Sequence, residues 1–451
     1  MSKINPQTIS LTAGDFPPAV RPFWANVPGN KPLRDALTLT SITCYCGLSP
    51  RLRVKYTYDN ALFLTMLVLN LLVIAPSGKG KGIIRWVVNM LMNGLIKRDT
   101  EQRRKLREYK ELPKKEREKL REPLLMIRFL QKFTLPVVVK YADLINRSYG
   151  DWLSFFLYGD ELASFTENRK GNAEFQAVAR TAYMLGETYS RDTLYQDGYN
   201  AMVDIMWNSV LCGQEQALAK YITQEGIVLG DAGRQMLVKL DDSLGEDVPN
   251  IRPLTDLQMS DIHLATSRLM SETFTDDDEL VPTHLVDMAW MDKDVRQWCD
   301  QVRDEVAKTG SRAMDSFYVR ASTSAFRIAT MLYHLWGEGR PELYGVSDSP
   351  EQIQRKVRRC YYYFAQLILD AAMEQWGRDY EAAMPKDKEN VAKKPSLYDQ
   401  LPNRFTREQL REQVQKLELS APVRVFICKW LKKKWIYEVE NDLYEKLYGK
   451  V

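Results

Sequence analysis

The chain has 451 residues, of which 45% are hydrophobic and 27% are charged, and its formal net charge is +4. This length suggests about three domains, and the composition is ordinary for a globular protein with a large core. The six cysteines and three histidines show no zinc-ligand or disulfide spacing. The N-terminus lacks a signal-peptide core, and the longest apolar run is too short to span a membrane. We therefore expect a reduced, cytoplasmic protein without membrane contact.

The positive charge is concentrated in two segments. Residues 97–122 carry twelve basic and seven acidic side chains, and residues 404–451 carry eleven basic and seven acidic ones. Two local basic regions suit a polyanionic partner, although a charge run is as often a solvated helix face. Pro113 interrupts the first segment, which predicts two helices in a projecting hairpin.

The first third of the chain alternates between helical and strand patterns. Residues 1–60 are expected to be a proline-rich, extended lead-in followed by a helix over 34–48. Residues 61–75 predict one buried strand. Residues 82–96 predict a helix, because apolar residues recur every three to four positions.

Four further apolar stretches, separated by turn signals, are also expected to be strands. They are residues 135–143, 154–162, 202–213 and 235–242. Strands that alternate with helices indicate an α/β fold with a mostly parallel sheet.

The rest of the chain divides by composition. Residues 243–280 contain prolines and an acidic run and are expected to be a linker, and residues 281–383 are helical throughout. We expect Arg320 and Arg327 in this helical region to pack against the core, with nucleotide sensing as the alternative. A second linker leads to a small domain at 400–451.

A glycine-rich loop lies between the strand predicted at 61–75 and the helix predicted at 82–96. Its residues are Ala75, Pro76, Ser77, Gly78, Lys79, Gly80, Lys81 and Gly82. A buried strand, a loop of glycines, a lysine and a helix N-terminus are the elements that bind ATP phosphates. Gly82 stands where a serine or threonine usually binds Mg²⁺, so a simple glycine-rich turn is the alternative.

An acidic pair strengthens the ATP prediction. Asp160 and Glu161 directly follow the apolar residues 153–159, about 80 residues after the loop. At the end of such a strand, Asp160 would position the metal Mg²⁺ and Glu161 would polarise the attacking water. With these two elements, residues 61–242 predict a P-loop NTPase core of the RecA/AAA kind, with 97–122 as an insertion.

Three further residues are weaker candidates. Asn208 lies within the strand predicted at 202–213, and Gln214 directly follows it. Either residue could sense the γ-phosphate, although an ordinary core strand explains both equally well. Arg234 precedes the last strand and could reach the γ-phosphate of a neighbouring subunit. A surface salt bridge is the alternative for Arg234.

The C-terminal 50 residues predict a winged helix. Thr406 and Gln409 have capping-box spacing at the start of a helix, and a second helix and a strand pair follow. The expected DNA-binding side chains of the second helix are Arg424, Lys429, Lys432, Lys433 and Lys434. Winged helices also bind proteins, which is the alternative.

The order of these motifs resembles a domain-of-unknown-function family of P-loop proteins from bacterial mobile elements and phages, usually described as helicase- or primase-associated. The resemblance covers residues from about 17 to the end, and includes the loop at 75–82, FLYGDELASF, SVLCGQEQAL and the terminal winged helix. Members often have glycine after the loop lysine. The family's arginine stretch differs from GDAGRQ here, which weakens the role of Arg234.

We therefore expect an ATP-dependent DNA helicase or translocase of a mobile-element or phage replication module, acting as a homo-oligomer such as a hexameric ring. The alternative is a nucleotide-binding DNA adaptor or replication initiator with little hydrolysis. Gly82 favours the adaptor, whereas the Asp160–Glu161 pair favours the motor. A defence ATPase acting on foreign nucleic acid is a weaker third possibility.

Overall fold

The computed structural model forms two compact units, Met1–Met384 and Pro385–Val451. The predicted boundaries near residues 60, 242 and 280 lie inside the first unit. The structure describes residues 9–56, 64–129, 135–149, 153–165, 169–183, 188–191, 201–240, 251–275, 277, 279–340, 348–384, 397, 401–416, 422–432 and 436–446. The helices of the first unit are α1 (Arg21–Ala25), α2 (Lys31–Gly47), α3 (Lys81–Leu91), α4 (Asn93–Glu111), α5 (Lys114–Arg117), α6 (Leu135–Tyr149), α7 (Arg169–Tyr183), α8 (Glu215–Tyr221), α9 (Gln224–Val228), α10 (Asp256–Ser271), α11 (Asp292–Thr309), α12 (Arg312–Leu335) and α13 (Pro350–Ala383).

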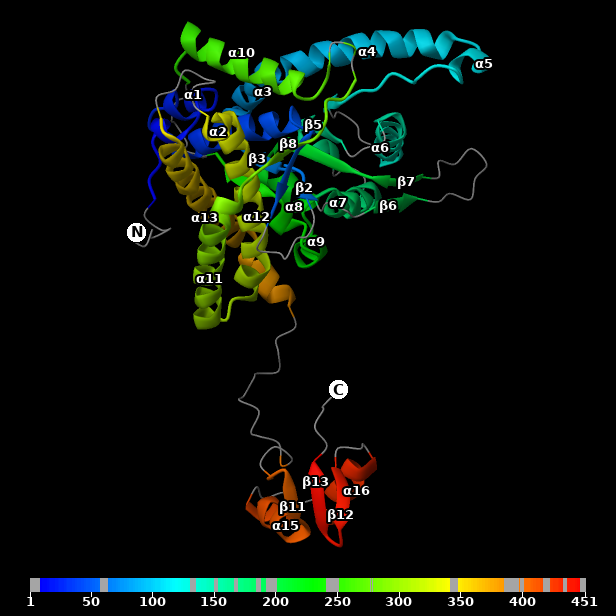
Figure 1. Cartoon of the computed structure of the whole chain (residues 1–451), viewed down its shortest axis with the longest axis vertical. Coiled ribbons are helices and arrows are strands. Elements are labelled where there is room, and N and C mark those ends of the chain that lie inside the picture. Colours follow the sequence, from blue (N-terminus) through cyan, green and yellow to red (C-terminus); the bar gives the residue numbers. More distant parts are fainter. Residues whose placement is uncertain are drawn as a thin grey trace. The chain divides into compact units, whose positions relative to one another are not determined.

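A five-stranded sheet lies at the centre of the first unit (Figure 1). In spatial order its strands are β4 (Ile127–Phe129), β5 (Ser154–Gly159), β8 (Met206–Gly213), β3 (Asn70–Ile74) and β9 (Met236–Lys239). Every neighbouring pair is parallel. Strands β3, β5 and β8 are buried along their whole length, which explains their nearly continuous apolar sequences. The predicted α/β fold with a mostly parallel sheet is confirmed.

Three predicted strands differ from the structure. The run at 61–75 contributes only β3 to the main sheet. The short β2 (Leu64–Thr65) instead pairs with β1 (Leu52–Lys55), which also pairs with β10 (His284–Val286). Residues 135–143 begin helix α6, because Val139, Ala142 and Ile145 are buried at helical spacing and outweigh the strand preference of the valines.

The strand predicted at 202–213 is divided at Ile205. Its second part is β8, and its first part, β7 (Ala201–Asp204), forms a separate antiparallel pair with β6 (Thr188–Arg191). The remaining short helical turns of the first unit are η2 (Ala13–Asp15), η3 (Leu162–Phe165), η4 (Ala232–Arg234), η5 (Ala289–Met291) and η6 (Gly337–Gly339).

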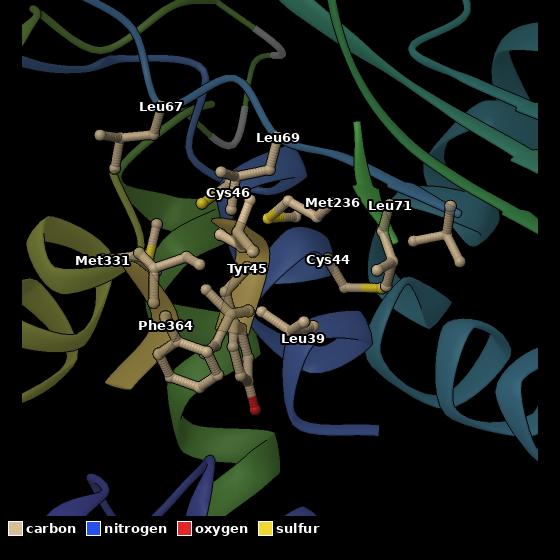
Figure 2. Close-up of a cluster of buried hydrophobic side chains, with 14 of the residues drawn as sticks. Leu39, Cys44, Tyr45, Cys46, Leu67, Leu69, Leu71, Met236, Met331 and Phe364 are labelled. Atoms are coloured by element: carbon tan, nitrogen blue, oxygen red, sulfur yellow. The ribbon is translucent and has the colours of Figure 1, made fainter. Parts of the chain in front are cut away.

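Helix α2 is the packing centre of this unit. Its side chains from Leu33 to Gly47 are buried except for Arg34, so the helix is enclosed on all sides. Figure 2 shows Tyr45 and its neighbours on α2 among side chains of the β3 segment, β9, α12 and α13. Asn30 caps the helix by accepting a hydrogen bond from the Leu33 amide at 2.8 Å. The predicted helix at 34–48 is confirmed.

The N-terminal region is more ordered than its proline content suggests. Residues 9–33 were expected to be an extended lead-in, but they include α1 and bury Phe16, Phe23 and Trp24 in the core. These aromatic side chains remove more apolar area from water than an extended segment could, so the prediction of a lead-in is wrong for the described part.

The predicted linker at 243–280 contains helix α10, so this prediction is wrong for the described residues. Thr255 and Gln258 form a capping box at its N-terminus. The side chain of Asn26 donates to that of Gln258 at 3.0 Å, which ties the helix to the N-terminal region. Helix α10 also contacts α3 and α4, as Figure 1 shows.

The charged segment 97–122 projects from the first unit, but it is not a helical hairpin (Figure 1). Helix α4 ends before Pro113 as predicted, and α5 beyond it is a single turn followed by extended chain. On α4, Arg104 pairs with Glu101 at 2.6 Å and with Glu108 at 2.5 Å. Local pairing of this kind supports the solvated-face alternative for part of the segment.

Arg327 on α12 connects three parts of the first unit. Its guanidinium donates to the carbonyl oxygens of Val68 and Tyr183 at 2.9 and 3.1 Å and to the hydroxyl of Thr65 at 3.0 Å. Burial lowers the pKa of this guanidinium, and oxygen acceptors compensate for the water it loses. The predicted packing role of Arg327 agrees with these contacts.

The described residues of the second unit form two helices and a three-stranded antiparallel sheet. Its elements are β11 (Arg404–Thr406), α15 (Arg407–Lys416), α16 (Val423–Lys432), β12 (Ile436–Glu440) and β13 (Leu443–Lys446), and the strand order is β11-β13-β12. Phe405, Ile427, Trp430 and Tyr444 belong to its separate core. The predicted helices and strand pair are confirmed, and so is the Thr406–Gln409 capping box, with bonds of 2.9 and 3.2 Å.

Across the described part of the chain, no helix combines the length and the apolar character that crossing a bilayer requires. All six cysteines are free thiols, and Cys428 is the exposed one among them.

Replacing Arg327 by methionine should lower the free energy of unfolding by about 2–4 kcal/mol, because two buried carbonyl oxygens and the partly buried Thr65 hydroxyl lose their donor. Urea denaturation followed by circular dichroism measures this change. The matched control is Arg296→Met on α11, where the arginine is exposed, with an expected change within about 0.5 kcal/mol. Equal effects of the two substitutions would contradict the connecting role of Arg327.

Candidate functional site

The glycine-rich loop joins the buried strand β3 to helix α3, as the sequence predicts. Gly78 and Gly80 have φ angles of 78° and 93°, in the left-handed region that side chains disfavour. The Ala75 amide donates to the carbonyl of Gly213 at 2.9 Å, which fixes the start of the loop on β8. The loop therefore keeps one defined conformation that only glycine adopts easily.

The loop has the features needed to hold a phosphate group. The amides of Lys81 and Gly82 are in the first turn of α3 and have no acceptor within the helix, so they are available to an anion. A Cβ atom at Gly82 would meet nothing within 4 Å, which leaves open space beside the helix N-terminus. These observations fit a nucleotide phosphate. Residue 82 also has room for the serine or threonine side chain that usually follows the loop lysine.

The register of the sheet brings the predicted residues to one edge. Ile74 of β3 is opposite Gly213 of β8, and Gly159 of β5 is opposite Leu211. The loop, Asp160 and Gln214 each follow directly after one of these strands. Because the strands are parallel, all three lie at the carboxyl edge, where open α/β sheets bind ligands.

The pKa of the buried Cys212 thiol is affected by charged side chains at this edge. Burial raises its pKa to about 12, Lys81 opposes this shift, and Asp160 and Glu161 add to it. One cation from the loop and two carboxylates from the turn after β5 therefore act on the same thiol near the end of β8. This arrangement can hold a phosphate and a divalent cation next to each other.

Arg85 is a site residue that sequence reasoning missed. Its Nη1 atom lies 3.1 Å from Oδ2 of Asp160, and the two side chains are 61% and 45% exposed. An ion pair this exposed contributes at most about 1 kcal/mol to stability, so a ligand can easily replace one of its partners. The signal in the sequence was its spacing of four residues from Lys81, which places both on one face of α3.

Glu161 lies beside Asp160 on the turn after β5. Its Oε1 atom accepts a hydrogen bond from the Ala163 amide at 3.4 Å, and the side chain is exposed. The turn is held close to β8 through Leu162. A Cβ atom at Gly213 would be only 2.5 Å from the Cβ of Leu162, so glycine permits this approach.

Gln214 is exposed and is the N-cap residue of α8 at the same edge. The next residue, Glu215, accepts hydrogen bonds from Lys239 at 3.3 Å and from Gln375 at 3.0 Å. Lys239 ends β9 and is opposite Ile74 in the sheet. Lys239 is thus a second cation near the loop that the sequence did not indicate.

Asn208 is not part of this group of residues. It is fully buried five residues before the end of β8, about 16 Å along the strand from the loop edge. Its Oδ1 atom accepts from the Leu69 amide at 2.8 Å, and its Nδ2 atom donates to Ser154 at 3.5 Å. Asn208 joins the strands away from the carboxyl edge, and these contacts favour the alternative of an ordinary core-strand residue over a γ-phosphate sensor.

Arg234 also lies away from the loop of its own chain, because it precedes β9 and the loop follows β3 in a parallel sheet. Its Nη1 atom donates to the Gly230 carbonyl at 2.9 Å. Burial and the neighbouring Arg320 lower its pKa to about 10. Asp231 supplies a nearby negative charge and pairs with Arg180 at 2.6 Å.

The predicted DNA-binding residues are on and beyond α16. Arg424 and Lys429 are exposed on this helix, and Lys432 is its last residue. Lys433 and Lys434 lie outside the described residues. The same helix exposes Val425 and Leu431, at 51% and 37%, so its surface is mixed and not purely basic.

No family model matches the chain, and neither does any curated protein. The loop, the three strand ends and the charged side chains around them carry the functional features of this chain, through the sheet register and the hydrogen bonds described above.

Two substitutions in the loop should separate its required conformation from its open space. Gly80→Ala should lower the free energy of unfolding by about 1–2 kcal/mol, because alanine disfavours a φ of 93°. Gly82→Ser is the matched control, with a change below about 1 kcal/mol because its Cβ has room. Urea denaturation of both variants measures the difference, and an equal loss would contradict this loop geometry.

Proposed function

We propose that the chain is a P-loop NTPase that hydrolyses ATP with Mg²⁺ and acts as a DNA helicase or translocase in a mobile-element or phage replication module. The observation that carries the proposal is the meeting of the glycine loop, the acidic pair and Gln214 at one sheet edge. The strand order supports it as well. One strand, β8, lies between the loop strand and the acidic strand, as in RecA- and AAA-type ATPases.

The residues at this edge divide the chemistry among them. The amides of Lys81 and Gly82 and the ammonium group of Lys81 would hold the phosphates. Asp160 would hold Mg²⁺ in place of its weak pair with Arg85, whose guanidinium lies one helical turn from Lys81. Glu161 would orient and polarise a water molecule, and Gln214 would donate to the γ-phosphate. Bound Mg²⁺ supplies positive charge that stabilises the phosphoryl group during transfer.

Arg234 fits the proposal only in an oligomer. It lies at the opposite sheet edge from the loop of its own chain, so it could reach only a phosphate that a second subunit holds. We therefore propose a homo-oligomer, with a hexameric ring as the working form. Release of the Arg234 guanidinium from the Gly230 carbonyl would be part of that contact.

DNA is the partner that the charge distribution favours. The second unit has the element order of a winged helix, with Arg424 and Lys429 exposed on the helix that would face the groove. The absence of exposed asparagine or glutamine on the described α16 favours contacts to phosphates over base readout. Residues 97–122 add a projecting basic segment.

A nucleotide-binding DNA adaptor or initiator with little hydrolysis is the second candidate. Two observations favour it: Gly82 provides no hydroxyl for Mg²⁺, and Arg85 pairs with the carboxylate that would bind the metal. The two candidates differ in turnover and not in ATP binding. A catalytic measurement with DNA therefore separates them.

Replacing Lys81 by alanine should lower ATP hydrolysis by about 100-fold, because a cation that stabilises the transferring phosphate is removed. Steady-state phosphate release with and without single-stranded DNA measures this. Lys79→Ala, two residues earlier in the loop, is the control and should retain most of the activity. If DNA-stimulated turnover of the wild type does not exceed that of Glu161→Gln, the motor proposal is wrong and the adaptor remains.

The double variant Arg424→Glu/Lys429→Glu should weaken DNA binding by the full chain. Because two phosphate contacts are lost, the slope of log affinity against log salt concentration should become shallower by about two. Fluorescence anisotropy at several salt concentrations measures the slope. Lys416→Glu on the exposed side of α15 is the control, and an equal change there would point to general charge and not to α16.

A further inference from the structure

Two of the three histidines lie together, although they are widely spaced in the sequence and indicated no metal site there. His284 comes from β10, His334 from the last turn of α12, and Glu338 from η6. One ligand atom from each lies within 4.8 Å of the other two. This cluster is separate from the nucleotide edge, which consists of the loop and the ends of β5 and β8.

Glu338 is the centre of the cluster. Its Oε1 atom lies 2.5 Å from Nε2 of His284 and 2.8 Å from Nδ1 of His334. Tetrahedral zinc with bonds near 2.0–2.1 Å separates its ligand atoms by roughly 3.3 Å. The carboxylate oxygen of Glu338 would therefore need to move away from the two ring nitrogens by about 0.5–0.8 Å to share such an ion with them.

The other nitrogen of His334 is already oriented. Its Nε2 atom lies 2.8 Å from Oε2 of Glu272 on the neighbouring α10, and Oε1 of Glu272 accepts from Nε of Arg268 at 2.5 Å. In metal sites, a histidine ligand usually donates its second ring N–H to a carboxylate, which fixes its tautomer and orientation. Glu272 is in the position that such an outer carboxylate occupies.

The backbone directs Glu338 towards the histidines at an energetic cost. Its φ angle is 56°, one of two positive values among the described residues other than glycine. The Tyr333 hydroxyl donates to the carbonyl of Glu338 at 3.0 Å and holds this conformation. A strained position that its surroundings maintain is typical of functional sites.

We propose that His284, His334 and Glu338 form a zinc site with three protein ligands and a fourth position open to water, and that Glu272 orients His334 from outside. Two imidazoles and one carboxylate favour zinc over Mg²⁺ or Ca²⁺, which prefer oxygen ligands. The side chain of His284 is 47% exposed, whereas that of His334 is 3% exposed, so the open position faces solvent beside His284.

Metal titration of the full-length, chelator-treated chain tests the proposal. With excess Mg²⁺ and no nucleotide, the wild type should bind one zinc ion, measured by competition with a chromophoric chelator and by elemental analysis. Bound Co²⁺ should give visible absorption typical of a four- or five-coordinate site. His284→Gln should weaken zinc affinity by at least about 100-fold, and Glu272→Gln by about 10- to 100-fold.

His263→Gln is the matched control, because His263 is an exposed histidine on α10 outside the cluster, and it should leave zinc binding unchanged. Far-UV circular dichroism checks that each variant is folded, and the exposure of His284 makes its replacement mild. If the wild type and His284→Gln bind zinc equally, or if His263→Gln weakens binding as much, the proposed site is wrong. Because nucleotide is absent, neither result depends on ATP hydrolysis.

Discussion

The parallel register of the central sheet is the constraint on which the rest of the structure depends. Ile74 and Gly213 end neighbouring strands at the same level, and Gly159 ends the next strand two residues earlier, opposite Leu211, so the residues that follow all three lie at one edge. The strands can be this apolar because helices cover both faces, with α2 enclosed between the sheet and α12 and α13. A shift of β8 by one residue would move Gln214 relative to the loop and Asp160 and turn each buried side chain of β8 to the other face of the sheet.

Burial divides the charged side chains of the first unit into two kinds. Arg327 is enclosed and donates to three oxygen atoms, so it has one possible position and contributes to stability. Arg85 and Asp160 are half-exposed and form a weak pair that a ligand can replace. The same types of group therefore have different roles, according to how much water each retains.

The two proposed ion sites differ in the chemistry of their ligands. At the sheet edge, carboxylates and a loop of amides suit Mg²⁺ and phosphate. Around Glu338, two imidazoles suit a softer transition metal. Glu272, which also pairs with Arg268, contacts the second ring nitrogen of the buried His334 and fixes its orientation. The sites are on different elements, so each can be tested without the other.

Local sequence patterns determined the parts of this protein that depend on neighbouring residues. The loop at 75–82, strand β5 with its acidic pair, the break before Pro113 and the capping box of Thr406 all match the structure, because they follow from backbone geometry over a few residues. Tertiary structure decided the rest. It packed α6 as a helix where valines favour a strand, and it placed Asn208 away from the carboxyl edge of the sheet. It also brought His284 and His334 together across 50 residues, because only the packing of β10 against α12 sets that distance.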